Sequence, residues 1–95
     1  MNTIAATVKT GNGGKYVRQL CKHWSHKLET QIEGDIGTVA FPGAVARMAA
    51  DEEGIAITIT GEDRADLERL TGVLASHLDR FAFREAPLVY DWAWQ

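Results

Sequence analysis

The spacing of hydrophobic residues between Lys15 and Glu29 is the feature that most constrains the fold. They recur at intervals of three and four positions, at Val17, Leu20, Cys21, Trp24 and Leu28. This spacing places them along one side of an α-helix, and that side must pack against another apolar surface. The pattern therefore predicts a helix over 15–29 that covers the core of a larger fold.

A second helix is predicted after Gly61, where a similar stripe comprises Leu67, Leu70, Leu74, Leu78 and Phe81. Asp63 precedes this stripe, and its carboxylate can accept hydrogen bonds from the free backbone N–H groups of a helix start. At ~100° per residue, His77 lies within about 50° of the centre of the stripe. We therefore expect Asp63 to cap this helix and His77 to be at least partly buried.

The remaining stretches alternate between apolar and polar residues or carry turn signals, which is typical of β-strands joined by hairpins. The predicted strands are Thr3–Thr10, Thr30–Glu33, Thr38–Ala50, Ile55–Thr60 and Leu88–Trp94. Phe41-Pro42-Gly43 interrupts the third strand, and we interpret it as an edge or a bulge because proline lacks a backbone donor.

These elements give the order β-α-β-β-β-α-β within a single domain, residues 1–95. Two amphipathic helices and hairpin-linked strands predict an α+β fold. We expect a two-layer sandwich in which a mostly antiparallel sheet carries both helices on one face.

Charge is distributed unevenly along the chain. Residues 1–30 carry five lysines and arginines against one acid, a net charge of +4, whereas residues 31–95 carry five against twelve, a net charge of −7. The first helix could therefore attract an anionic ligand or an acidic partner. The total of −3 argues against a nucleic-acid partner.

No stretch approaches the ~20 apolar residues that span a bilayer. The N-terminus also lacks the pattern of a signal peptide. We therefore expect a cytoplasmic protein with no membrane partner. The lone cysteine cannot form an internal disulfide.

The first predicted helix concentrates candidate metal ligands. Cys21, His23 and His26 form the pattern C-x-H-x-x-H, and thiolate and imidazole are common ligands of zinc and related ions. Cys21 and His26 point about 140° apart around a helix, so they cannot bind the same ion. The candidate metal set is therefore His23, His26 and His77, with a zinc or iron ion as its cofactor.

The alternative is that His77 is a hydrogen-bonded core residue, Cys21 a packing residue, and the other two histidines surface residues. Tyr16, His23 and Lys27 share one edge of the predicted helix, so an edge pocket with His26 beside it is also geometrically allowed. Catalysis is not expected, because a cysteine within an apolar stripe is usually inert.

Tyr90, Trp92 and Trp94 share one face of the last predicted strand. Two interpretations are open. The rings either pack on the core side of the sheet, or they face outward and form a partner surface or a homodimer contact.

Three runs of residues resemble a bacterial family catalogued as domain of unknown function 2218. They are LCKHWSHK at Leu20–Lys27, SHLDRFAFRE at Ser76–Glu85 and LVYDW at Leu88–Trp92. The resemblance implies a small cytoplasmic domain without an assigned activity. It also implies a link to iron uptake or to iron release from siderophores, since some members accompany siderophore-interacting, flavin-dependent ferric reductases. The family pattern falls on Cys21, Lys22, His23, His26, Lys27, His77, Arg80, Phe81, Phe83, Arg84 and Glu85.

Two hypotheses follow. The first is a small non-enzymatic binding or accessory domain for a ligand such as a ferric siderophore, or for a siderophore-interacting reductase as partner. Its ligand-binding site would use His23, His26, Lys27, His77, Arg80 and Arg84. The second is a structural or interaction module that dimerises, or docks on a partner, through its sheet.

Overall fold

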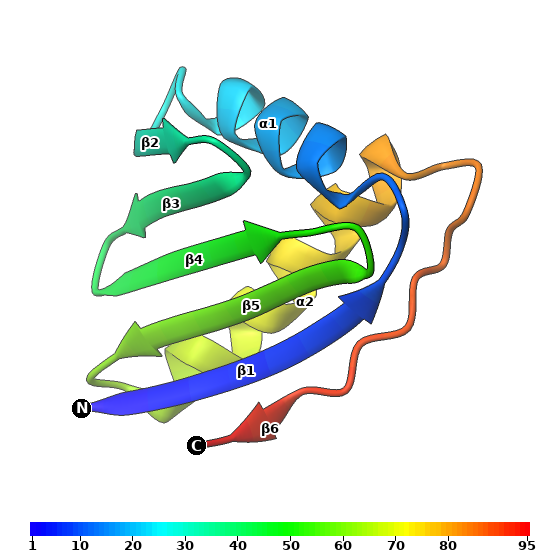
Figure 1. Ribbon diagram of the computed structural model, residues 1–95. Helices are drawn as coiled ribbons and strands as arrows, with labels where there is room; N and C mark the ends of the chain where they lie inside the picture. The colour runs from blue at the N-terminus through cyan, green and yellow to red at the C-terminus, as the bar shows by residue number, and fades with distance from the viewer.

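The computed structural model describes residues 1–95 and contains one sheet with two helices on the same face (Figure 1). This arrangement confirms the predicted two-layer α+β fold, with one strand more than predicted. In chain order the elements are β1 (Asn2–Lys9), α1 (Gly13–Trp24), β2 (Glu29–Glu33), β3 (Ile36–Phe41), β4 (Ala44–Ala50), β5 (Gly54–Gly61), α2 (Arg64–Phe81) and β6 (Ala93–Trp94).

The six strands pair in the order β2-β3-β4-β5-β1-β6, and every pair is antiparallel. The first strand of the chain, β1, therefore lies between β5 and β6 (Figure 1). Its register with β5 runs from Asn2 opposite Gly61 to Lys9 opposite Gly54. Because β6 also pairs with β1, the two termini lie close together.

The additional strand comes from the stretch that contains Pro42. The predicted strand Thr38–Ala50 is two strands, β3 and β4, joined by the two-residue turn Pro42-Gly43. Gly43 has a φ of +79°, a conformation that glycine adopts readily, and proline presets the preceding turn position. The interpretation of this segment as an edge or a bulge is therefore wrong, since it is a hairpin turn.

The helix α1 ends earlier than predicted, at Trp24 instead of Glu29. The Trp24 carbonyl oxygen accepts hydrogen bonds from the N–H groups of both Lys27 (2.9 Å) and Leu28 (2.8 Å). The first of these bonds spans three residues, which tightens the last turn and leads the chain into β2. Residues 25–28 therefore form a turn beyond the helix.

The helix α2 begins as predicted, with Asp63 as its N-cap. The Asp63 carboxylate accepts hydrogen bonds from the N–H groups of Ala65 (2.9 Å) and Asp66 (3.4 Å). Neither helix is long and apolar enough to cross a membrane.

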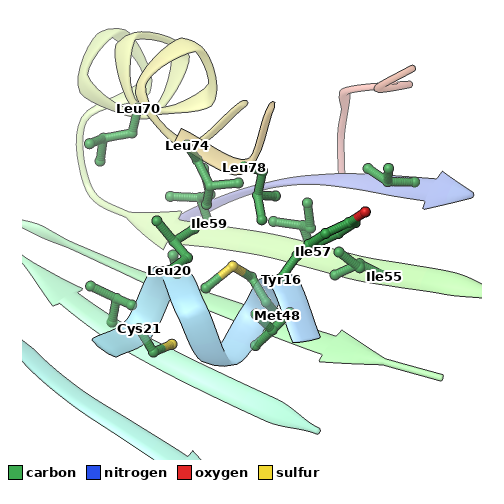
Figure 2. Close-up of a cluster of buried hydrophobic side chains, with 14 of the residues drawn as sticks. Tyr16, Leu20, Cys21, Met48, Ile55, Ile57, Ile59, Leu70, Leu74 and Leu78 are labelled. Atoms are coloured by element: carbon green, nitrogen blue, oxygen red, sulfur yellow. The ribbon is translucent and has the colours of Figure 1, made fainter. Parts of the chain in front are cut away.

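The core lies between the helices and the sheet. Both predicted helical stripes are buried there, apart from the half-buried residues at their C-terminal ends. Figure 2 shows side chains of α1 and α2 meeting the inward-facing isoleucines of β5 and Met48 of β4. In the same view, the Tyr16 ring packs in the core while its hydroxyl points toward the edge of the cluster.

Gly37 allows α1 to approach the sheet closely. A Cβ atom at this position would lie 2.5 Å from Cys21 Sγ and 2.8 Å from Val17 Cγ1. Because such distances are well inside van der Waals contact, only glycine fits here without displacing the helix.

The C-terminal strand pairs with β1 only at Ala93 and Trp94, not over the predicted Leu88–Trp94. Just before β6, the Asp91 carboxylate accepts a hydrogen bond from the Thr7 N–H (2.6 Å). In a regular strand pair, this N–H would donate to a backbone carbonyl. The alternation of faces is nevertheless as predicted. The rings of Tyr90, Trp92 and Trp94 are half-buried against the core, which confirms the packing interpretation of these aromatics.

Candidate functional site

Two of the three candidate histidines meet between the helices. α1 and α2 lie on the same face of the sheet and contact each other, with their axes crossing (Figure 1). His23, exposed in the last turn of α1, and His77, half-buried in α2, have ring centroids 5.9 Å apart, with their planes inclined by 41°. We call these two residues the histidine pair.

The tautomer of the neutral His77 ring is set by a contact within its own helix. Its Nδ1 lies 2.7 Å from the carbonyl oxygen of Val73. Because a carbonyl oxygen can only accept, Nδ1 carries the proton of the neutral ring and Nε2 keeps a lone pair. A histidine that binds a metal usually donates its other ring N–H in this way.

Aromatic side chains form the surroundings of the histidine pair. The Trp24 ring lies 5.0 Å from His77, and the Phe81 ring lies 6.0 Å from His23, as centroid distances. Phe41 packs edge-on against Trp24 at 5.1 Å. The pair therefore lies at the solvent-facing side of an apolar cluster, with His77 closer to the core.

His26 does not complete a metal site with the histidine pair. It lies in the exposed turn after Trp24, since α1 ends before it and its side chain does not follow the helical positions assumed for it. No group of three histidine, cysteine, aspartate or glutamate side chains could hold a metal ion. The set of His23, His26 and His77 is therefore reduced to the histidine pair.

The candidate cations Lys27, Arg80 and Arg84 are all exposed. The ion pairs of the structure involve the N-terminus with Glu62, Arg18 with Asp35, and Arg69 with Asp66. The three candidate cations thus have no carboxylate partner. Arg80 lies three residues after His77, on a neighbouring part of the same helical surface.

Glu85, which follows α2, connects segments that lie far apart in the sequence. Its carboxylate accepts hydrogen bonds from the Thr10 hydroxyl (2.9 and 3.0 Å), the Asn12 amide (3.3 Å) and the Tyr16 hydroxyl. The bond from Tyr16, followed by that from Thr10, lowers the pKa of Glu85 below its usual value. The same bond raises the pKa of Tyr16, with a smaller contribution from burial.

A cavity of about 280 Å³ opens beside Glu85, and we call it the Glu85 cavity. It lies where the first turn of α1 approaches the end of α2 and the segment that follows it. Its lining consists of Asn12, Lys15, Tyr16, Phe81, Phe83, Arg84 and Glu85.

The predicted edge pocket is not one continuous site. Tyr16 lines the Glu85 cavity, whereas His23 belongs to the histidine pair, and Phe81 touches both regions. Sequence reasoning missed the roles of Lys15 and Glu85 in this cavity. The one sequence signal that pointed to Glu85 is that the family-like segment Ser76–Glu85 ends on this residue.

Cys21 belongs to the core and not to a site. It is fully buried, and burial raises the pKa of its thiol. The thiolate, which is the form that reacts and binds metals, is therefore disfavoured.

Fold and site together define a small α+β domain with candidate binding features along the seam between its two helices. The chain belongs to the family described as an uncharacterized protein conserved in bacteria (DUF2218), whose model matches residues 5–93. This match confirms the resemblance seen in the sequence. No curated protein matches the chain.

The chain is also similar to a solved structure, the NMR structure of PA4090 from Pseudomonas aeruginosa. The two share 29% sequence identity with a TM-score of 0.80. The similarity covers 100% of this chain and 96% of the other. The two-layer fold described above is therefore shared with an experimentally determined structure.

Proposed function

We propose that the chain is a small accessory binding domain that holds an anionic metal chelate at the histidine pair. The proposal depends on one observation. The two imidazole rings come from different helices and lie 5.9 Å apart, and His77 has a free Nε2 lone pair because its Nδ1 is bound to the Val73 carbonyl.

The donor set fits a chelated ion better than a free one. A structural zinc ion takes four protein ligands, whereas two imidazoles are available here. An ion that a small chelator already holds needs only one or two further ligands. Two Zn–N bonds of ~2 Å would place the two ring nitrogens ~3–4 Å from each other. Because the ring centroids are 5.9 Å apart, rotation of the side chains can bring the nitrogens to this separation.

The surrounding charge favours an anionic chelator. Lys27, Arg80 and Arg84 are exposed and have no carboxylate partner, so their positive potential is available to a ligand. Carboxylate and catecholate groups would be attracted to these cations. The link to iron, with a ferric siderophore as ligand and a siderophore-interacting reductase as partner, is part of this proposal and follows from what the sequence resemblance implies.

The proposal is tested by calorimetric titration of the untagged protein with ferric citrate, a ferric tricatecholate chelate, each chelator without iron, and zinc chloride. We expect the ferric chelates to bind to the wild type. His23→Ala and His77→Ala should each lower this affinity about tenfold or more. His26→Ala is the matched control, because His26 is exposed and lies outside the histidine pair. Its effect should be small.

The proposal fails if none of these probes binds, or if both His23→Ala and His77→Ala leave every affinity unchanged. Binding of the iron-free chelators with equal affinity would also contradict it, because the histidines would then have no metal to contact.

The second candidate is an interaction module that dimerises through its sheet. It is favoured by one feature, the sheet face opposite the helices, which no other element covers (Figure 1). The aromatic residues that first suggested it, Tyr90, Trp92 and Trp94, are half-buried against the core and do not lie on this uncovered face. Sedimentation equilibrium tests this candidate, since a strict monomer at high concentration would eliminate the dimer.

A further inference from the structure

The Glu85 cavity has the composition of a small binding site, and neither member of the histidine pair contributes to it. Within its lining, the exposed Glu85 carboxylate is the shared hydrogen-bond acceptor. Because Thr10, Asn12 and Tyr16 all donate to this carboxylate, its charge is stabilised by neutral donors and its position is fixed. The cavity therefore has a preorganised polar side.

Two phenylalanines also line the cavity. Phe81 is half-buried, whereas Phe83 is 70% exposed. The Arg84 guanidinium lies 5.7 Å from the centre of the Phe83 ring. Phe83 thus presents an uncovered ring beside a cation.

The rim carries an excess of positive charge. Lys15 and Arg84 line the cavity, and neither belongs to an ion pair of the structure. Together with Glu85 they give the lining a net charge of +1. A volume of about 280 Å³ lies just below the range of about 300–1,000 Å³ that is typical of small-molecule sites, so the ligand would be a single ring and not a larger molecule.

We propose that the Glu85 cavity binds a small aromatic carboxylate. The aromatic ring of the ligand packs against Phe83 and Phe81, and its carboxylate accepts hydrogen bonds from Lys15 and Arg84. The tethered Glu85 carboxylate disfavours ligands with a second negative charge on the opposite side of the ring, because like charges would then approach each other.

The test is a titration of the isotope-labelled full chain, followed through backbone amide chemical shifts. Benzoate is the probe. Acetate keeps its charge without the ring, benzyl alcohol keeps the ring without the charge, and inorganic phosphate tests simple anion binding. We expect saturable shifts with benzoate at residues around the cavity, and at least about tenfold weaker binding of the other three probes, since each lacks one of the two contacts.

Three variants remove one contact each: Phe83→Ala, Lys15→Gln and Arg84→Gln. All three side chains contact solvent, so the variants should keep the wild-type spectrum outside the cavity. We expect each to weaken benzoate binding by about fivefold or more. The matched controls are Val89→Ala, an apolar residue that is 82% exposed, and Arg69→Gln, a cation whose carboxylate partner is Asp66; both should bind benzoate like the wild type.

The proposal is overturned if benzoate causes no saturable shifts, if acetate or phosphate binds equally well, or if Phe83→Ala leaves the affinity unchanged. Binding that His77→Ala abolishes and Phe83→Ala does not would place benzoate at the histidine pair and would also overturn it. The outcome is separable from that of the proposed function, because Lys15 and Phe83 line the Glu85 cavity and belong neither to the histidine pair nor to the cations proposed to attract the chelate.

Discussion

The hydroxyl of Tyr16 donates a hydrogen bond to the carboxylate of Glu85, which lies 69 positions further along the chain. Tyr16 lies in the first turn of α1, and Glu85 lies in the segment that follows α2. The same carboxylate also accepts from Thr10, just after β1. One side chain therefore ties the segment after α2 to the end of β1 and to the start of α1, which lie 75 and 69 positions earlier.

Glu85 should stabilise the fold at neutral pH but not in acid. Its pKa is lower in the folded state than its usual value near 4.5, so its contribution is complete above that value and is lost as the pH falls through the folded pKa. We expect Glu85→Gln to lower the free energy of unfolding by ~1 kcal/mol at neutral pH, a value reduced for exposure to solvent. Urea unfolding at a series of pH values measures this.

The wild type and Glu85→Gln should become equally stable in acid. The control is Glu68→Gln, which replaces an exposed carboxylate that makes no side-chain hydrogen bond or ion pair. A difference between wild type and Glu85→Gln that stays constant from neutral to acidic pH would show that the charge of Glu85 is not involved.

Both tyrosines should resist ionisation in the folded protein. The hydrogen bond to Glu85 raises the pKa of Tyr16, and burial raises the pKa of Tyr90, with Asp79 adding to it through a hydrogen bond from the Tyr90 hydroxyl (3.0 Å). Stability from these groups is complete below the usual tyrosine pKa near 10 and is lost as the pH rises through the folded values.

An ultraviolet absorbance titration of the tyrosinates provides the measurement. The folded chain should ionise at higher pH than the same chain in concentrated urea. If either tyrosine titrated near pH 10 in the folded state, its hydrogen bond or burial as described would be wrong.

Two glycine substitutions should have opposite effects. Gly37→Ala would push a methyl group against Cys21 Sγ and Val17 Cγ1, and we expect a loss of ~1–3 kcal/mol from this overpacking. Gly72 is an exposed position of α2, and nothing lies within 4 Å of the Cβ that Gly72→Ala would add. It should stabilise the protein by ~0.5–1 kcal/mol because alanine favours the helix.

Thermal or urea unfolding of the two variants and the wild type measures these signs. Cys21→Ala in the Gly37→Ala background should recover part of the loss, since it removes the nearer of the two clashing atoms. No recovery would place the strain at Val17 instead.

Replacing the N-cap residue Asp63 of α2 by alanine should destabilise the protein, whereas replacing it by asparagine should not. Asp63→Ala leaves the N–H groups of Ala65 and Asp66 without their acceptor, at a cost of ~1 kcal/mol. For a domain of this size, that corresponds to a fall in Tm of ~4–8 °C. Asp63→Asn is the control, because asparagine caps a helix about equally well. Equal losses in the two variants would mean that the negative charge, and not the cap, is what matters.

The sequence by itself determined the local elements and the faces they bury. The spacing of Val17, Leu20 and Cys21 predicted a helix and its buried side, and Asp63 predicted the start of the next helix. Both were confirmed because helical periodicity and capping depend on residues within a few positions of each other. The same reasoning was wrong at Pro42, where it predicted an edge or a bulge and the structure has a hairpin turn, since a bulge and a turn differ only in whether the flanking strands pair with each other.

Only the tertiary structure decided which distant residues meet. The insertion of β1 between β5 and β6, the approach of His23 to His77, and the bond between Tyr16 and Glu85 all join positions more than 40 residues apart. Such contacts follow from how the helices pack on the sheet, and hydrophobic burial does not depend on distance along the chain. Periodicity therefore predicts which side chains face inward, whereas packing determines which neighbours they find there.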